Sequence, residues 1–308
     1  TVKIVGDQFA QTVVQNWITG FRSYHPGAQI SAKLEGTLTA MAGIYTSTAD
    51  IALMGRPATV SEHDAFYFVF RHEPLSIEVM NGSLDVSGKS SALVIFVNRD
   101  NPLQNLTLAQ LDAVFGMEHK RGLKNIRTWG ELGVSGEWAN HTVNVYMYDS
   151  QTGPGAYFDQ VVLKGSSKWS WDHIREFKDI ARAPNGFEYP AGKQIVDALS
   201  ADRYGLAVSS LRYVRPDVKA VALAGDADQG YYAPTPQNIV QRLYPLSRSI
   251  VAYVNCPSGQ PLDPRVSEFL RYVLSREGQE AVRKDSGYLP LSIDTLTAQL
   301  NVLSGEHR

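Results

Sequence analysis

The chain repeatedly passes from short apolar runs to helical stripes of apolar residues, with a polar, glycine-bearing turn at each change. Residues 143–163, VNVYMYDSQTGPGAYFDQVVL, show this pattern most clearly, because strand-like alternation gives way to a bend and then to helical spacing. Ser150 and Thr152 suit a helix N-cap, and Gly153 permits a tight turn. A helix N-terminus presents N–H donors and a positive dipole end, so this turn predicts anion binding, although an ordinary strand-to-helix connection has the same pattern.

The same arrangement occurs twice near the N-terminus. In residues 1–21 a short strand turns at Gly6 and continues as a helical stripe, so that Asp7 can cap the helix near the backbone N–H groups of Gln8 and Phe9. A second strand runs into a turn that carries Gly36, Thr37 and Thr39. Three such turns favour several helix N-termini that bind one anion, whose identity the pattern does not give.

Further segments extend this alternation of strands and helices. The continuous apolar run 92–97 predicts a buried strand, and the spacing of apolar residues predicts helices over 106–117, 169–180, 191–202 and from 264 onward. Strands that alternate with helices along a chain indicate an α/β fold.

Composition narrows the class of protein. A length of 308 residues favours two domains, and 29 basic against 31 acidic residues give a net charge of -2, which offers no electrostatic footprint for a nucleic-acid partner. The single cysteine excludes an internal disulfide, and no H-E-x-x-H or G-x-S-x-G motif is present. We therefore predict no metal, no cofactor and no catalytic residues, and a protein that is not an enzyme.

Four segments then carry a resemblance to a known family. In chain order, VNRDNPLQNLTLAQLDAVFGM, YDSQTGPGAYF, LYPLSRSIVAYVN and EFLRYVLSREGQEAVRKDSGYLPL resemble the phosphate-binding periplasmic proteins of ABC transporters. The resemblance implies an α/β, two-lobed type II periplasmic binding protein fold, in which each lobe is a mixed sheet flanked by helices and the ligand cleft lies between the lobes. It implies a discontinuous lobe 1 of residues 1–90 plus 247–308, a lobe 2 of residues 91–246, and hinge strands near 93–98 and 244–253.

The resemblance also places ligand loops on the three turns. Together they predict a ligand-binding set of Gln8, Phe9, Gly36, Thr37, Thr39, Ser150, Thr152 and Gly153. Hydroxyl, amide and backbone donors of this kind suit an oxyanion.

Two positions depart from the family pattern. Where the family carries an aspartate that accepts the proton of hydrogen phosphate, this chain has Gly55-Arg56, and where the family has an arginine it has Tyr148. A guanidinium binds oxyanions in a bidentate fashion, so we expect Arg56 to replace the missing arginine, with Tyr148 beside the ligand. The alternative for Arg56 is an ordinary surface arginine that follows a strand. The alternative for Tyr148 is a half-buried aromatic residue of a strand. Loss of the acceptor carboxylate should weaken the discrimination of phosphate from sulfate.

The expected function is that of an extracytoplasmic solute-binding protein, which captures inorganic phosphate for a membrane ABC permease or a sensor. The resemblance implies a monomer in the bacterial periplasm or envelope, after removal of a signal peptide. Three alternatives stay open: a receptor for another oxyanion or a phosphorylated small molecule, an enzyme that acts on phosphate esters, and a structural protein with an empty cleft.

Overall fold

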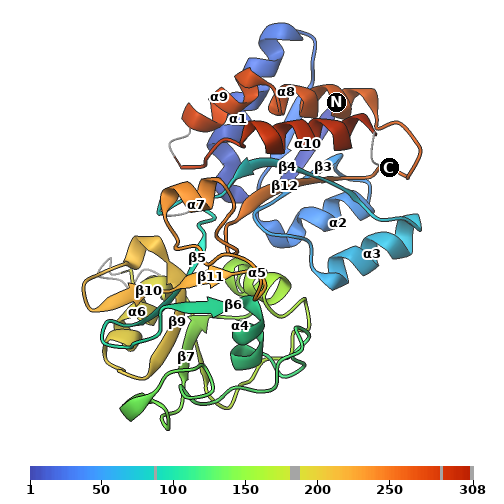
Figure 1. Ribbon diagram of the computed structural model, residues 1–308. Helices are drawn as coiled ribbons and strands as arrows, with labels where there is room; N and C mark the ends of the chain where they lie inside the picture. Colours follow the sequence, from blue (N-terminus) through green and yellow to red (C-terminus); the bar gives the residue numbers. More distant parts are fainter. Residues whose placement is uncertain (87–88, 181–187, 285–286, 306–308) are drawn as a thin grey trace. The chain divides into compact units, whose positions relative to one another are not determined.

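The computed structural model describes residues 1–86, 89–180, 188–284 and 287–305, and the chain forms two compact units (Figure 1). Unit 1 comprises Thr1–Ser90 and Arg248–Arg308, and unit 2 comprises Ser91–Ser247. Each unit is built on a five-stranded sheet that mixes parallel and antiparallel strands. The α/β class with mixed sheets flanked by helices is therefore confirmed.

The sheet of unit 1 has the strand order β2-β1-β3-β12-β4. In this order the strands are Ile30–Lys33, Val2–Gly6, Ile51–Met54, Ser249–Val254 and Leu75–Asn81. Strand β1 is parallel to β2 and β3, whereas β12 is antiparallel to both β3 and β4. The carboxyl ends of β1 and β3 and the amino end of β12 consequently lie at one edge of the sheet.

Helices cover both faces of this sheet (Figure 1). The elements are η1 Gln8–Ala10, α1 Gln11–Tyr24, η2 Thr37–Thr39, α2 Ala40–Tyr45, α3 Val60–Phe70, α8 Pro264–Val273, α9 Arg276–Lys284 and α10 Ile293–Ser304. Because side chains alternate along a strand, Ile250 and Ala252 of β12 pack in the core with α1 and α8, whereas Val251 and Tyr253 pack in the core with α2 and α3. A sheet buried on both faces can present polar groups only at its ends.

The sheet of unit 2 has the order β10-β5-β9-β7-β8, and a two-stranded sheet pairs β11 with β6. The strands are β5 Leu93–Asn98, β6 Asn105–Thr107, β7 Asn144–Tyr148, β8 Ile174–Phe177, β9 Gly205–Ser210, β10 Val218–Ala220 and β11 Ala222–Ala224. The helices are α4 Leu108–Phe115, η3 Gly136–Trp138, α5 Gly153–Val161, α6 Ala191–Ser200, η4 Leu211–Tyr213 and α7 Pro236–Val240. Since β7 is parallel to β8 and β9, the carboxyl ends of these three strands share one edge.

Most predicted elements of unit 2 are confirmed, but one is wrong. Strand β5 is buried, α4 and α6 form where apolar spacing predicts helices, and α5 follows the turn at Thr152. The helix predicted over residues 169–180 is instead the strand β8, which pairs in parallel with β7. Pairing with the edge of a sheet outweighs the helical spacing of a short amphipathic segment. Within the described ranges, no helix is long and apolar enough to cross a membrane.

Candidate functional site

A cluster of charged side chains lies at the sheet edge of unit 1. Asp7 follows β1, Gly55 follows β3, and Arg248 precedes β12. Because Val251 of β12 pairs with Met54 of β3 in antiparallel register, the topology brings all three positions to the same edge. The same edge is where ligands bind in α/β sheets, at the carboxyl ends of parallel strands.

Asp7 is the acid of this cluster, and only 2% of its surface is exposed. Its Oδ1 accepts a hydrogen bond of 3.0 Å from the Phe9 amide and thereby caps η1, as the sequence predicts. The Tyr288 hydroxyl lies 3.5 Å from Oδ2. Burial raises the pKa of Asp7, and the Phe9 amide, Arg248, Tyr288 and Lys89 offset only part of that effect.

Arg248 and Lys89 supply the positive charge beside Asp7. Arg248 is buried, and its Nε and Nη2 both donate to the carbonyl oxygen of Gly55, with Nε at 3.2 Å. Lys89 Nζ donates to the Phe9 carbonyl at 2.9 Å and lies 4.7 Å from the centre of the Tyr288 ring. The two cations are therefore fixed in place by backbone oxygens and an aromatic ring.

The absence of a side chain at Gly55 allows Asp7 and Ser90 to pack closely beside it. A Cβ atom at Gly55 would lie 2.5 Å from Ser90 Oγ and 2.7 Å from Asp7 Oδ2, which is closer than real Cβ contacts. The space beside Gly55 is thus occupied by the carboxylate of Asp7 and the hydroxyl of Ser90.

The ligand residues predicted for unit 1 lie along the same edge. The amide of Gly36 donates to the Gly6 carbonyl at 2.8 Å, which holds the turn after β2 against the end of β1. The Gln8 side chain is exposed, with its Oε1 3.6 Å from where a Cβ of Gly36 would lie, and Phe9 is 43% exposed. Thr37 is half-buried, and the exposed Thr39 donates from Oγ1 to the Gly36 carbonyl at 3.2 Å. The five predicted residues of unit 1 therefore lie together at the edge where β1 ends, and their contact with a ligand stays a prediction.

Arg56 has a protein partner in the structure. It is 2% exposed, and its Nη1 and Nη2 donate to the two carboxylate oxygens of Glu62 at 2.7 and 3.0 Å. Nη1 also donates to the Pro57 carbonyl at 3.0 Å. Although burial alone would raise the pKa of Glu62, the bonds from Arg56 and the Thr59 amide lower it. The predicted ligand role of Arg56 would require its guanidinium to leave the half-buried carboxylate of Glu62, and this role stays a prediction.

The second cluster lies at the sheet edge of unit 2, in the turn before α5. Thr152 is the N-cap: its Oγ1 accepts from the Gly155 amide at 3.4 Å and donates to the Asp149 carbonyl at 2.6 Å. Asp149 Oδ1 accepts from the Gln151 amide at 2.8 Å, and the Ser150 amide donates to Glu176 at 2.5 Å. Two amides of the predicted anion turn are therefore bound by the protein's own carboxylates.

One lysine partly balances these acids. Lys178 Nζ lies 3.0 Å from Asp149 Oδ2, and this contact raises the pKa of the exposed lysine. Glu176 and Lys178 come from β8 and the residue just after it, the segment that helical spacing misassigned. A correct strand assignment would have placed both at the carboxyl edge of the unit 2 sheet.

Tyr148 packs towards α6 rather than towards the α5 turn. A Cβ at Gly192, in the first turn of α6, would lie 2.5 Å from the Tyr148 hydroxyl and 2.4 Å from the Tyr213 ring. The hydroxyl lies 3.5 Å from Ser209 Oγ, and burial raises the pKa of Tyr148 to about 12. Tyr148 thus has the environment of a half-buried aromatic residue on a strand, and its contact with a ligand stays a prediction.

Sequence reasoning missed Lys89, Ser90, Arg248 and Tyr288. They come from three segments far apart in the chain, and although Arg248 and Tyr288 lie in segments that carry the family resemblance, no local pattern marks any of the four as part of a site. The antiparallel pairing of β12 with β3 is the signal that could have identified Arg248, since this pairing brings Arg248 to the end of β1. Among the described residues, no group of three histidine, cysteine or acidic side chains could hold a metal ion.

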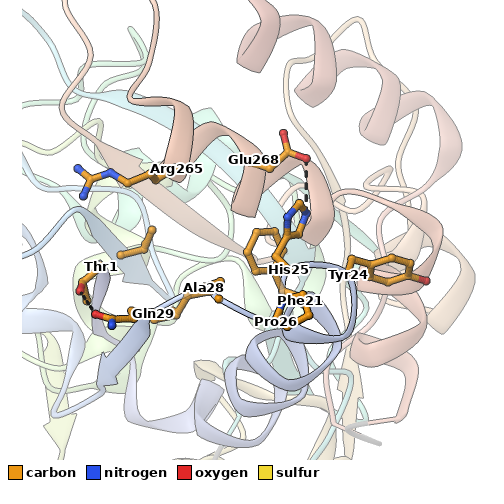
Figure 2. Close-up of a pocket in the computed structure, with 12 residues that line it drawn as sticks. Thr1, Phe21, Tyr24, His25, Pro26, Ala28, Gln29, Arg265 and Glu268 are labelled. Carbon is orange, nitrogen blue, oxygen red and sulfur yellow. Dashed lines mark hydrogen bonds and ion pairs between the residues drawn. The ribbon is translucent and has the colours of Figure 1, made fainter.

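A separate cavity of about 670 Å³ lies in unit 1 at the start of β1, away from the Asp7 edge (Figure 2). His25 stacks on Phe21 with ring centres 4.4 Å apart, and its Nε2 lies 3.8 Å from Glu268 Oε1. Arg265, at the rim, is paired with Asp263. The cavity offers rings and a single acid–base contact rather than a set of anion donors.

Comparison with known proteins defines the class. A family model described as a PBP superfamily domain matches residues 1–277, so the chain belongs to the PBP superfamily. The α/β architecture with two mixed sheets agrees with this assignment and with the resemblance seen in the sequence.

Individual proteins that resemble this chain give more detail than the superfamily. The chain is 32% identical over 289 residues to the phosphate-binding protein PstS of Pseudomonas aeruginosa, covering 93% of this chain and 82% of that protein. Among solved structures, PstS of Borrelia burgdorferi matches with a TM-score of 0.61 at 15% identity, covering 94% and 98% of the two chains. An ABC-type phosphate transport receptor of Vibrio cholerae matches with a TM-score of 0.57 at 18% identity, covering 94% and 99%. These relatives are named for binding or transport and not for catalysis, as the sequence predicts.

Proposed function

We propose that this chain is a receptor that binds inorganic phosphate and hands it to a membrane ABC transporter. The single observation that carries the proposal is the cluster of Asp7, Lys89 and Arg248 at the ligand edge of unit 1. Membership of the PBP superfamily and the names of the relatives support the same ligand class.

The proposed ligand set keeps the predicted donors and changes the source of charge. In unit 1 it comprises Gln8, Phe9, Gly36, Thr37 and Thr39, and in unit 2 it comprises Ser150, Thr152 and Gly153. We place the principal cationic role on Arg248 and not on Arg56, because Arg56 is bonded to Glu62 at both terminal nitrogens. A guanidinium beside backbone and hydroxyl donors is a suitable arrangement for an oxyanion.

We further propose that the protein acts as a monomer outside the cytoplasm of a bacterium, with a permease or a sensor as its membrane partner. The two units would serve as the two lobes of the receptor, with hinge strands near residues 93–98 and 244–253. The names of the relatives support the transporter partner, and the compactness of each unit supports the lobes.

Calorimetry on protein freed of bound phosphate tests the proposal. The titrants are phosphate, arsenate, sulfate and several phosphate esters, and the variant is Arg248→Met, which keeps the apolar stem and removes the charge. We expect saturable phosphate binding by the parent and a loss of at least about tenfold in the variant, because a charge-assisted hydrogen bond contributes about 1.5–3 kcal/mol.

The control variant is His25→Ala, which alters the separate cavity in the same unit. Its phosphate affinity should equal that of the parent. Tight binding of a phosphate ester with no binding of phosphate would assign the chain to the phosphorylated-ligand alternative. No binding of any anion would refute the proposed function.

A further inference from the structure

The cavity at the start of β1 has the size of a ligand site. Its volume of about 670 Å³ falls within the range of about 300–1,000 Å³ that is usual for sites of small molecules. Phe21, Tyr24 and His25 line it from the end of α1, and Arg265 and Glu268 line it from α8 (Figure 2). Residues at this helical spacing share one face, so the cavity is bounded by a row of rings and by two charged side chains.

Two of the rings are left to contact a ligand. Phe21 is buried, because His25 stacks on it with ring centres 4.4 Å apart and Phe269 meets it edge-on with ring centres 5.4 Å apart. Tyr24 and His25 are exposed, and both line the cavity. A tyrosine ring attracts a cation to its face, because the π electrons make that face negative. The rings thus favour a ligand that is apolar or positively charged.

The charged side chains of the cavity do not neutralise each other. Arg265 is paired with Asp263, to which its Nε and Nη2 donate at 3.1 and 2.6 Å, and its guanidinium points away from Glu268 (Figure 2). His25 Nε2 lies 3.8 Å from Glu268 Oε1, which is longer than a hydrogen bond, and a histidine is normally neutral at about pH 8. In the described part of the chain, no lysine or arginine forms an ion pair with Glu268. The cavity therefore keeps one carboxylate without a counter-ion.

This combination selects a ligand by its charge. An ionised carboxylate only accepts hydrogen bonds, so Glu268 suits an ammonium group and repels an anion. The rings of Tyr24 and His25 suit an apolar body attached to that ammonium group. The cavity therefore has the opposite preference to the sheet edge that carries Lys89 and Arg248.

We propose that this cavity is a second ligand site, which binds a small organic cation made of an ammonium group and an apolar ring. The ammonium group donates to the Glu268 carboxylate, and the ring packs on Tyr24 and His25. The site belongs to unit 1 and does not depend on the proposed function, so either inference can fail without the other.

A set of small probes tests the site on the unmodified protein. Phenethylammonium has both features, phenethyl alcohol lacks the charge, propylammonium lacks the ring, and phenylpropionate reverses the charge. A primary ammonium keeps its proton at about pH 8, as lysine does. In an NMR titration at low ionic strength we expect a dissociation constant of about 1 mM or below for phenethylammonium. The alcohol and propylammonium should bind at least about fivefold more weakly, and phenylpropionate should not bind.

Two results with the parent protein would overturn the inference. One is equal affinity for phenethylammonium and phenethyl alcohol, since the carboxylate would then have no role. The other is absence of any shift with phenethylammonium at about 10 mM, ten times the expected dissociation constant.

The matched variants are Glu268→Gln and Glu280→Gln, each a change from carboxylate to amide on the surface of unit 1. Glu280 lies on α9 and lines a neighbouring hollow, which shares Tyr24 with the cavity. Glu268→Gln should weaken phenethylammonium at least about fivefold and leave the alcohol unchanged, whereas Glu280→Gln should bind both as the parent does. An equal loss in the two variants would show a general attraction of cations to this surface, and would overturn the assignment to the cavity.

The ring contact has its own pair of variants. Tyr24→Leu keeps an apolar side chain without a π face and should weaken phenethylammonium by about two- to fivefold, whereas Tyr24→Phe should keep the parental affinity. Equal affinities in these two variants would overturn the contact with the ring. Phosphate titration of each variant should match the parent, and a parent that binds phenethylammonium but no phosphate would overturn the proposed function alone.

Discussion

Arg56→Ala provides the sharpest test of how unit 1 is held together, because the substitution breaks an ion pair that is nearly free of solvent. The side chains of Arg56 and Glu62 are 2% and 16% exposed, and their closest atoms are 2.7 Å apart. Glu62 also closes the capping box of α3 by accepting from the Thr59 amide at 2.7 Å. The variant leaves this carboxylate with its cap contacts but without its counter-ion.

The cost follows from that burial. Removing one partner of a buried pair costs about 3–5 kcal/mol, whereas an exposed pair contributes about 0–1 kcal/mol. For a unit of this size each kcal/mol lowers the melting temperature by roughly 2–4 °C, so the transition of unit 1 should fall by about 6–20 °C. The control Arg265→Ala breaks a pair whose side chains are 60% and 38% exposed, and it should fall by less than about 4 °C.

Differential scanning calorimetry without ligand measures both variants, and phosphate titration of each completes the test. The pH dependence gives a second readout: the folded state lowers the pKa of Glu62, so its stabilisation is present above its usual value of 4.5 and is lost as the pH falls. Arg56→Ala should lose much of that acid sensitivity. A variant with parental stability but abolished phosphate binding would show that Arg56 serves the ligand, and would refute the structural role.

Three further predictions concern the two sheet edges. The folded state raises the pKa of Asp7, so its contribution to stability is present below about pH 3.8, its ordinary pKa, and is lost as the pH rises through the pKa of the folded state. The ligand-free Asp7→Asn variant should therefore be at least as stable as the parent at about pH 8, as measured by urea denaturation. Thr152→Ala should destabilise unit 2 by about 1 kcal/mol through loss of the α5 cap, and a change below about 0.3 kcal/mol in the same assay would contradict that role. Glu176→Gln removes a negative charge from the Ser150 amide, so calorimetry should show an increase of about two- to fivefold in phosphate affinity, and unchanged affinity would exclude the α5 turn from the anion site.

The sequence is sufficient for those parts of the fold that depend on local pattern. Alternation and helical spacing identify β5, α4 and α6, and turn chemistry identifies the caps at Asp7 and Thr152. Strand β8 shows the limit, because its Ile174-Arg175-Glu176-Phe177 segment has spacing compatible with a helix until β7 is available as a partner.

The candidate site is less accessible to sequence reasoning because its charges come from distant segments. Arg248 reaches the cluster only through the antiparallel pairing of β12 with β3, and Lys89 through contacts with Phe9 and Tyr288. Arg56 shows the converse case: an arginine after a strand has the right chemistry for an oxyanion, and only the structure shows that the capping box of α3 places Glu62 against it. Sequence gives the residue type, and tertiary structure decides which partner neutralises it.

Binding of phosphate by this chain is tested by calorimetric titration of phosphate into the protein after bound phosphate has been removed. We expect one saturable site, and a ligand at 100 times its dissociation constant should stabilise the folded protein by about 2.7 kcal/mol in a parallel thermal scan. Absence of both binding heat and thermal stabilisation at about 1 mM phosphate would contradict the claim that this chain is a phosphate receptor.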